Sequence, residues 1–287
     1  MMRLTAPDYT FEQVLDTCLR GITGNAAFKL SIEGAKASLI VEGELYASNS
    51  REGNLYSIAP IDLSIDLNPI VLSDLNKSDF IKLYETYFVP EEKPAREIYN
   101  KLLNAAKESC PFCGGIGTPR NLDHFLPKSH FPQYSVLPAN LVPSCRDCNM
   151  DGKAAVFAIQ AEHQIIQPYL DHERFFNEQW IFARYEEEGG GEPGQFEYFV
   201  NPPSNWSETD KRRVERHFED FNLGHRYSVK AAQILGTVMA QVASLQRIGL
   251  NNQVISETIL APGVSTAQFS NHWQCGLYQA LMRHFEE

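Results

Sequence analysis

Two pairs of cysteines with the same internal spacing are the residues whose chemistry is easiest to assign. Cys110 and Cys113 form one Cys-x-x-Cys pair, and Cys145 and Cys148 form another after a gap of 31 residues. Thiolates at this spacing fit a tight turn in which both sulfurs bind one Zn²⁺, and four thiolates leave no position for water. The pairs therefore predict a structural zinc site. A redox motif or coincidental buried thiols are the alternatives, but a redox motif does not explain the second pair.

An Asp-His dipeptide, Asp123 and His124, lies between the pairs, with Asn140 later in the gap and Asn149 directly after the last cysteine. Phosphodiester hydrolysis needs an activated water, and an imidazole with a pKa of about 6.5 suits the role of general base. An Asp carboxylate and an Asn amide oxygen are hard ligands suited to Mg²⁺ or Mn²⁺. On an extended strand, neighbouring residues point to opposite sides, so the carboxylate would face the metal and the imidazole the water. The structural alternative is a local Asp-His hydrogen bond and an asparagine helix cap.

The stretch from residue 110 to residue 153 resembles the HNH nuclease superfamily. The matching elements are Leu122-Asp123-His124, Asn140-Leu141-Val142, and Cys145-Arg146-Asp147-Cys148-Asn149 continuing to Lys153. The resemblance implies a ββα-metal module, in which two strands and a helix hold one divalent metal ion. It further implies that Asn140 holds the loop between the strands and orients His124, and that Asn149 is a metal ligand together with Asp123.

The sequence departs from those relatives that carry histidines at the third position, because Asn149 and Lys153 stand there instead. Without these imidazoles, Mg²⁺ is favoured over Zn²⁺ as the catalytic ion. Lys128, Arg146 and Lys153 are then the candidate contacts to the phosphates of the substrate. His130 lies near the motif but outside it, and we expect it at the surface or behind the site.

Over a longer stretch, about residues 95–245, the sequence is similar to one branch of this superfamily. The branch comprises HNH proteins of prokaryotic anti-phage defence operons, such as the HNH subunit of Septu-type systems. The strings that carry the likeness are LDHFLPKSHFPQYSVLPANLVPSCRDCN, NPPSNW and RVERHFEDFNL. The resemblance implies antiviral defence and gating by a partner ATPase. The chain itself contains no P-loop, so any nucleotide use would belong to that partner.

The sequence thus predicts a metal-dependent HNH endonuclease that hydrolyses DNA. The alternative is a zinc-knuckle nucleic-acid-binding or adaptor protein without catalysis. The motif does not distinguish DNA from RNA, or a nick from a double-strand break, and a double-strand cut requires a homo-oligomer or two successive nicks. No recognition helix is evident, and a module that grips mainly the phosphate backbone predicts no sequence preference.

The net charge of −11 argues against a protein that coats DNA by phosphate neutralisation alone. The most basic stretch runs from Lys211 to Lys230 and includes Arg213 and Arg216. It is either a positive wall that tracks the DNA backbone or a solvated helix face balanced by neighbouring acids. No segment approaches the roughly 18 apolar residues of a membrane helix, and no signal peptide is evident. We therefore expect a cytoplasmic protein without membrane contact.

The fold class that we predict is α+β, with a mainly helical scaffold that carries a zinc-stapled ββα-metal HNH module. Three regions are expected. Residues 1–75 form a small N-terminal α+β segment of unknown role, residues 76–166 the nuclease core with its zinc site, and residues 167–287 a β-hairpin followed by helices. Cys18 and Cys275 stand apart from the pairs and are predicted to be buried apolar thiols.

Periodicity and capping residues place the individual elements. In the first region we expect a helix from Tyr9 to Ile22 with Thr10 as its cap, and short strands at 28–32, 38–41 and 55–58. In the second region, helices fill 76–108, interrupted by Pro90 and Pro94, and an apolar helix covers 154–166. The third region contains a strand pair at 180–185 and 196–200 and helices at 208–221, 223–247 and 265–287.

Overall fold

The computed structural model describes residues 1–153, 156–187 and 194–286. The helices are α1 (Phe11–Gly21), α2 (Ala26–Glu52), α3 (Lys77–Lys82), α4 (Arg96–Asn104), α5 (Arg174–Asn177), α6 (Glu208–Asp220), α7 (Leu223–Arg247), α8 (Asn252–Ile255), α9 (Ala261–Ser265) and α10 (Trp273–Glu286). The strands are β1 (Ile70–Leu72), β2 (Leu75–Asn76), β3 (Asn121–His124), β4 (Leu141–Ser144), β5 (Ile181–Glu186) and β6 (Gln195–Val200). They pair in sequence order as three two-stranded sheets, so the predicted α+β, mainly helical fold is confirmed.

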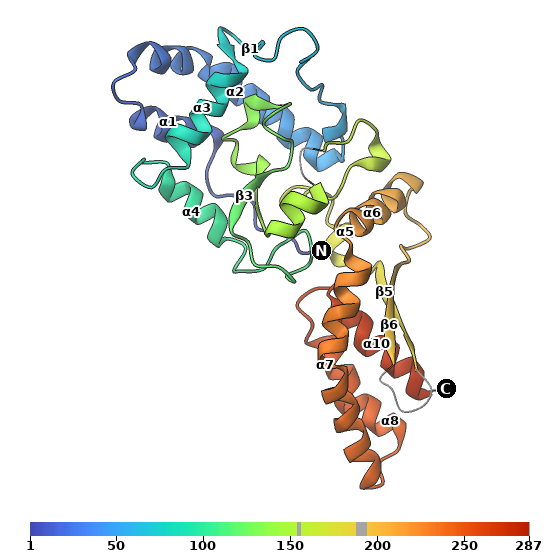
Figure 1. Cartoon of the computed structure of the whole chain (residues 1–287). Coiled ribbons are helices and arrows are strands. Elements are labelled where there is room, and N and C mark those ends of the chain that lie inside the picture. Colours follow the sequence, from blue (N-terminus) through green and yellow to red (C-terminus); the bar gives the residue numbers. More distant parts are fainter. Residues whose placement is uncertain (154–155, 188–193, 287) are drawn as a thin grey trace.

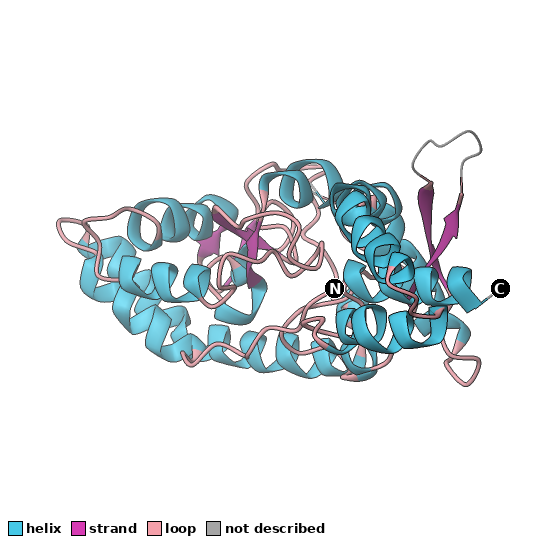
Figure 2. Ribbon diagram, turned by 90° about the horizontal axis from the view of Figure 1, so that it is seen from below, coloured by secondary structure: helices cyan, strands magenta, loops and turns pink. Residues whose placement is uncertain are grey.

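The chain forms two parts. Helices α1 to α4 gather around β3, whereas α7, α8, α10 and the hairpin β5–β6 form an elongated arm (Figure 1). The view from below shows the same separation, with the N-terminus between the two parts (Figure 2). The first residues of the chain lie at this junction, because Met2 N donates to Pro111 O at 3.1 Å and Leu4 N donates to Pro168 O at 3.0 Å.

Helix α1 begins where the sequence predicts. The Thr10 hydroxyl accepts from Gln13 N and the Gln13 side chain accepts from Thr10 N, which makes a capping box. The strands expected at 28–32 and 38–41 are wrong, because both lie inside the 27-residue helix α2. Its buried positions recur at helical spacing, and left-handed Gly53, with φ of 72°, ends it.

The remaining predictions for the first half are of mixed outcome. The strand expected at 55–58 is instead a 3₁₀ turn at Leu55–Ser57, and the small sheet β1–β2 lies further along the chain. Helices α3 and α4 confirm the helical expectation for 76–108, with a π-helical turn at Leu83–Phe88 extending α3. The apolar helix expected at 154–166 is wrong where the structure describes it, since 156–166 contain only a 3₁₀ turn at Ala161–His163. Residues 154–155 lie outside the described residues.

The second half follows the sequence more closely. Strands β5 and β6 pair antiparallel in the predicted place, while the glycine-rich tip at 188–193 lies outside the described residues. Helix α6 starts at its predicted cap Ser207, and α7 has the predicted bounds. The last helix begins at Trp273 rather than at residue 265. The short helices α8 and α9 lie before it, and α9 ends at Ser265. Cys18 and Cys275 are buried, as expected.

Helix α4 packs against both strands of the β3–β4 hairpin and supports it from one side. A buried ion pair between Asp171 and Arg213, 2% and 3% exposed, ties the segment after the hairpin to α6. Arg213 Nε also donates to Gln164 O at 2.9 Å, so its charge is neutralised and its donors are used. Within the described ranges, no helix is long and apolar enough to cross a membrane.

Candidate metal centre and hydrolytic site

The four predicted cysteine ligands converge. The sulfurs of Cys110, Cys113, Cys145 and Cys148 all lie within 4.8 Å of one another, and all four residues are buried. Tetrahedral zinc with Zn–S bonds of about 2.3 Å would separate its sulfurs by about 3.8 Å. The Sγ atoms of Cys113 and Cys145 are 4.0 Å apart, which fits this arrangement closely. Four buried thiols at this spacing are suited to hold a metal such as zinc.

Backbone N–H groups point at the sulfurs from both turns. Cys145 N donates to Cys110 Sγ at 3.4 Å, and Gly117 N donates to Cys113 Sγ at 3.3 Å. A side chain at position 117 would collide with Cys145, so a glycine is needed where the two turns approach. The donors stabilise negative charge on sulfur, as a set of thiolate ligands requires.

The thiols also perturb one another's titration. The hydrogen bond with Cys110, the largest cause, lowers the pKa of Cys113 to about 7 although that with Cys145 raises it, while the hydrogen bond with Cys113 raises the pKa of Cys110. Like charges this close cannot all form unless a cation lies between them. The chemistry of this donor set therefore favours a bound divalent ion.

Arg226, from α7, is a residue of this centre that the sequence did not reveal. Its Nη1 donates to Cys148 Sγ at 3.2 Å, and its Nη2 lies 3.8 Å from Cys145 Sγ and 3.6 Å from an Asp147 carboxylate oxygen. Four thiolates around Zn²⁺ carry a net charge of −2, which the guanidinium partly offsets. Arg226 lies 78 residues beyond Cys148, and no local pattern links the two.

The Asp-His dipeptide lies at the end of β3. In the antiparallel register Asp123 pairs with Val142 and His124 pairs with Leu141. Asp123 and His124 are only 8% and 7% exposed. His124 Nε2 lies 2.9 Å from Ser135 O. Because a carbonyl oxygen only accepts, this contact assigns the proton to Nε2, and Nδ1 is then the basic nitrogen of the neutral ring.

Tyr84 is a second residue that sequence reasoning missed. Its ring lies edge-on to His124 with 4.5 Å between centroids, and Lys128 Nζ lies 4.7 Å from the Tyr84 ring centre. Burial, with smaller contributions from Tyr99 and Asp123, raises the pKa of Tyr84, so its phenol stays neutral. Tyr84 thus contacts both Lys128 and His124.

Asn140 is fully buried and holds the turn that follows β3. Its Oδ1 accepts from Leu126 N at 2.7 Å, and its Nδ2 donates to Leu126 O at 3.0 Å and to Tyr134 O at 3.2 Å. Asn140 O also accepts from Phe125 N, directly after His124. The side chain therefore fixes the loop between the strands and, through it, the start of the segment that carries Ser135.

The other predicted site residues are more dispersed. Asn149 is half-buried in the helical segment that contains Cys148–Lys153, and its N donates to Cys145 O at 3.0 Å. Lys128 forms an ion pair with Glu85 at 3.0 Å, and Arg146 is exposed. The backbone of Lys153 closes the helical segment, but its side chain lies outside the described residues.

The basic stretch does not form an open positive wall. Arg213 is buried against Asp171, and His217 is fully buried with its Nε2 2.9 Å from Phe112 O. Two further members pair along α6 itself, Lys211 with Glu208 at 2.7 Å and Arg212 with Glu215 at 2.9 Å. These ion pairs favour a charge-balanced helix face over a positive wall for α6, while Arg213 and His217 are buried and fit neither interpretation.

The fold and the site define an α+β protein in which a buried four-cysteine cluster lies beside a short Asp-His hairpin. No family model matches the chain, and no solved structure matches it. The chain is 37% identical over 293 residues to protein ea31 of Escherichia phage lambda, covering 98% of this chain and 97% of that protein. It therefore belongs to the family of the phage lambda protein ea31.

Proposed function

We propose that the chain is a metal-dependent endonuclease of the HNH type that hydrolyses phosphodiester bonds in DNA. The observation that carries the proposal is the β3–β4 hairpin, with Asp123 and His124 on its first strand and a helical segment containing Asn149 after its second strand. This order of two strands and a helix is what the resemblance implies for a ββα-metal module. The hydrogen bonds of Asn140 support its assigned role as the loop clamp.

In this proposal His124 is the general base. Its Nε2 is held by Ser135 O, so Nδ1 takes the proton of the attacking water. Asp123 and Asn149 hold the catalytic Mg²⁺ or Mn²⁺, and their oxygen donors suit such a hard ion. When bound, the ion supplies Lewis-acid stabilisation of the phosphate. Lys128, Arg146 and Lys153 contact the substrate backbone, and the cysteine cluster holds zinc as a structural ion.

The low exposure of Asp123 and His124 bears on how the site is used. A phosphate must reach both groups, so the hairpin surroundings have to open before cleavage. This supports gating by a partner, for which the resemblance implies an ATPase in an anti-phage defence operon. The same low exposure favours the second candidate, a zinc-knuckle nucleic-acid-binding or adaptor protein that does not catalyse.

The test is cleavage of supercoiled plasmid by wild-type and His124→Ala protein with Mg²⁺, with Mn²⁺ and without added metal. We expect metal-dependent nicking or linearisation that falls by about 10²–10⁴-fold in the variant, because a general base contributes that much. His225→Ala is the matched control and should cut like the wild type, because His225 is exposed on α7 and lies outside the motif. Both variants should retain their zinc and melt near the wild-type temperature.

Lack of cutting by the wild type alone directs the assay to the proposed partner ATPase. Cleavage that appears only with the ATPase and nucleotide supports the gated nuclease. Protein that holds zinc and binds nucleic acid, but never cuts with or without the ATPase, establishes the adaptor instead.

A further inference from the structure

A pocket with a volume of about 130 Å³ lies directly beside the β3–β4 hairpin. Two of its lining residues are neighbours of proposed site residues in the sequence, since Phe125 follows His124 and Gly152 lies three positions after Asn149. The pocket therefore adjoins both strand β3 and the helical segment Cys148–Lys153 of the proposed nuclease module. None of the predicted catalytic residues lines it.

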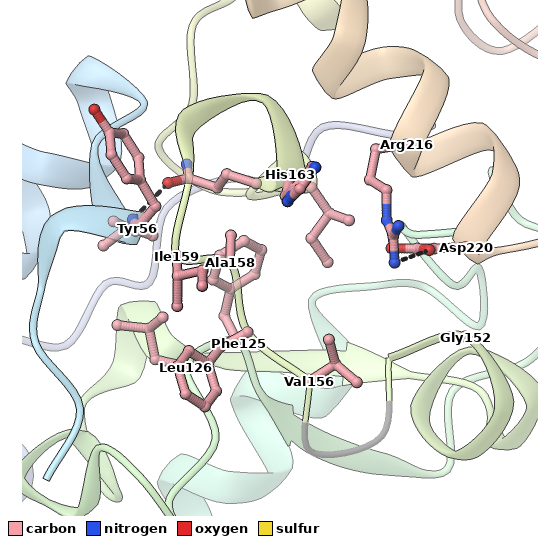
Figure 3. A pocket seen from close by; sticks show the side chains of 14 residues that line it. Tyr56, Phe125, Leu126, Gly152, Val156, Ala158, Ile159, His163, Arg216 and Asp220 are labelled. Atoms are coloured by element: carbon pink, nitrogen blue, oxygen red, sulfur yellow. Dashed lines mark hydrogen bonds and ion pairs between the residues drawn. The ribbon is translucent and has the colours of Figure 1, made fainter. Parts of the chain in front are cut away.

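The pocket has an apolar side and a charged side. In Figure 3, Tyr56 and Ile159 lie on one side, Phe125 lies below them, and Arg216 and Asp220 lie on the opposite side. Arg216 and Asp220 form an ion pair at 2.8 Å, and the Arg216 side chain is 42% exposed. A cation thus faces solvent at the rim of an aromatic pocket.

The volume limits what the pocket can hold. A cavity of about 150 Å³ in another protein binds one benzene molecule, so about the same space here admits a single six-membered ring. The fused rings of a purine fit this space less well than a single ring, and a whole nucleotide exceeds it. The chemical class that fits is therefore one planar monocyclic ring.

The walls are suited to such a ring. The aromatic residues Phe125 and Phe157 line the pocket, whereas the ring of Tyr56 points away from the other labelled side chains in Figure 3. The Phe157 ring is fixed from behind by Phe131 at 5.1 Å and by His130 at 4.9 Å between ring centroids. Flat rings bind to aromatic faces by stacking, and every base has such a face.

One polar group inside the pocket requires a partner. Gln164 lines the pocket, is 2% exposed, and accepts at its Oε1 from Tyr56 N at 2.8 Å. Its Nε2 is buried and has no hydrogen-bond partner in the described part of the chain. Buried donors are almost always paired, so this one calls for an acceptor on whatever occupies the pocket. A pyrimidine offers such an acceptor in its O2 carbonyl.

We propose that this pocket binds one unstacked pyrimidine base of the nucleic acid strand held at the hairpin. The ring stacks against the aromatic walls, its carbonyl accepts from Gln164 Nε2, and the adjoining phosphate lies toward Arg216. The inference rests on the proposed nuclease function. It gives the protein a base preference beside the cut, which contacts to the phosphate backbone alone do not supply.

The test is fluorescence anisotropy with labelled single strands of thymidine, of deoxyadenosine and of abasic sites. Ca²⁺ replaces Mg²⁺ so that strands are bound through the same kind of oxygen ligands. We expect the wild type to bind the thymidine strand about tenfold tighter than the other two, because stacking of one base contributes on the order of this factor. Gln164→Leu and Val156→Trp should each remove the preference, the first by deleting the donor and the second by filling the pocket.

Val229→Trp on α7 is the matched control, because Val229 is also partly exposed but lies away from the pocket, and it should keep the preference. Because Gln164 Oε1 also pairs with Tyr56 N, a misfolded Gln164→Leu leaves Val156→Trp as the deciding variant. Equal affinity for the three strands, or an unchanged preference in Val156→Trp, overturns the pocket proposal. If plasmid cleavage remains intact in that case, the nuclease proposal survives. Absence of binding, together with absence of cleavage both with and without the partner ATPase, overturns both.

Discussion

The cysteine cluster and the Asp-His hairpin lie on one stretch of chain, yet they are completed in different ways. The cluster has all its donors in place: four sulfurs within 4.8 Å, backbone N–H groups from both turns, and Arg226 from the arm. The hairpin supplies two side chains at a strand end, supported by Asn140 and Tyr84. The cluster is thus a set of ligands that converge on one point, whereas the hairpin presents two buried side chains whose role in hydrolysis is our proposal.

The largest effect should come from the cysteine cluster. Cys145→Ser removes one of the four proposed zinc ligands, and because structural zinc in small modules contributes about 10–16 kcal/mol, we expect loss of bound zinc and of cooperative folding around β3–β4. Zinc per chain by atomic emission and a thermal melt measure this. Cys275→Ser is the control, since Cys275 is buried far along the chain and should leave one zinc bound. A Cys145→Ser protein that keeps its zinc and its melting temperature would break the assignment.

Asn140 tests how rigid the hairpin side must be. Asn140→Ala leaves the Leu126 N–H and two buried carbonyls without the side chain, and each unpaired group costs about 1–3 kcal/mol. We expect a lower melting temperature together with slower cleavage per folded molecule, because the loop that reaches Ser135 loosens. Denaturant unfolding and plasmid cleavage at a temperature where both proteins are folded give the two values.

Asn271 provides a matched control for that prediction. It is also fully buried, and its Oδ1 accepts from Trp180 N at 2.7 Å and from Ile181 N at 3.0 Å in the arm. Asn271→Ala should be destabilised to a similar degree while its cleavage rate, corrected for the folded fraction, is unchanged. If both variants lose cleavage equally, the effect is one of global stability and Asn140 has no positioning role.

Local spacing explains what could be predicted from the sequence. The two cysteine pairs are each four residues long, and a knuckle turn follows from that spacing alone. Helix α7 was predicted to the residue because its buried positions, Leu223, Tyr227, Ala231, Leu235, Val238 and Val242, keep a helical period over its whole length. The Ser207 and Thr10 caps fixed the starts of α6 and α1 for the same reason.

Elements governed by distant contacts were missed. The run Leu39-Ile40-Val41 has strand-forming side chains, yet it lies inside α2. Within this run only Leu39 is buried and Val41 is 62% exposed, so packing rather than local propensity decides that the run is helical. Arg226 and Tyr84 reach the two centres through tertiary contacts that no spacing in the sequence reveals. The cysteine ligands, which lie close together in the sequence, were thus predictable, whereas Arg226 and Tyr84, which support the two sites from other elements, were not.

A smaller effect would sharpen the role of Arg226. Arg226→Met keeps most of the side-chain volume but removes the donors to Cys148 and Cys145. Outer contacts to metal ligands are commonly worth about 10–100-fold in metal affinity, so we expect faster loss of zinc to a competing chelator. Arg226→Lys should lose zinc at a rate between those of Arg226→Met and the wild type, because it keeps the charge. Arg247→Met, at the exposed end of α7, should behave as the wild type; equal zinc retention in all of them would mean that Arg226 only packs.

The smallest expected effect compares two histidines with the same contact. His217 Nε2 lies 2.9 Å from Phe112 O, as His124 Nε2 does from Ser135 O, but His217 is fully buried behind the first cysteine turn. Burial lowers the pKa of His217 to about 3. Folding therefore keeps this imidazole neutral, and the free energy of unfolding should fall as the pH drops below about 6.5, where the unfolded chain takes up the proton, by at most about 1.4 kcal/mol per pH unit.

His217→Gln should flatten that dependence between about pH 6.5 and pH 5, because glutamine donates to Phe112 O without titrating in this range. Some slope will remain, since burial also lowers the pKa of His272 to about 4 and acts with the same sign. The measurement is denaturant unfolding across this range with zinc content followed in parallel, which separates imidazole protonation from loss of metal. His225→Gln, at an exposed position of α7, should keep the wild-type slope. A wild-type slope in His217→Gln would mean that the acid sensitivity comes from other groups, such as His272, the thiolates or the Met1 amine, whose pKa burial lowers to about 5, and that the buried imidazole contributes packing alone.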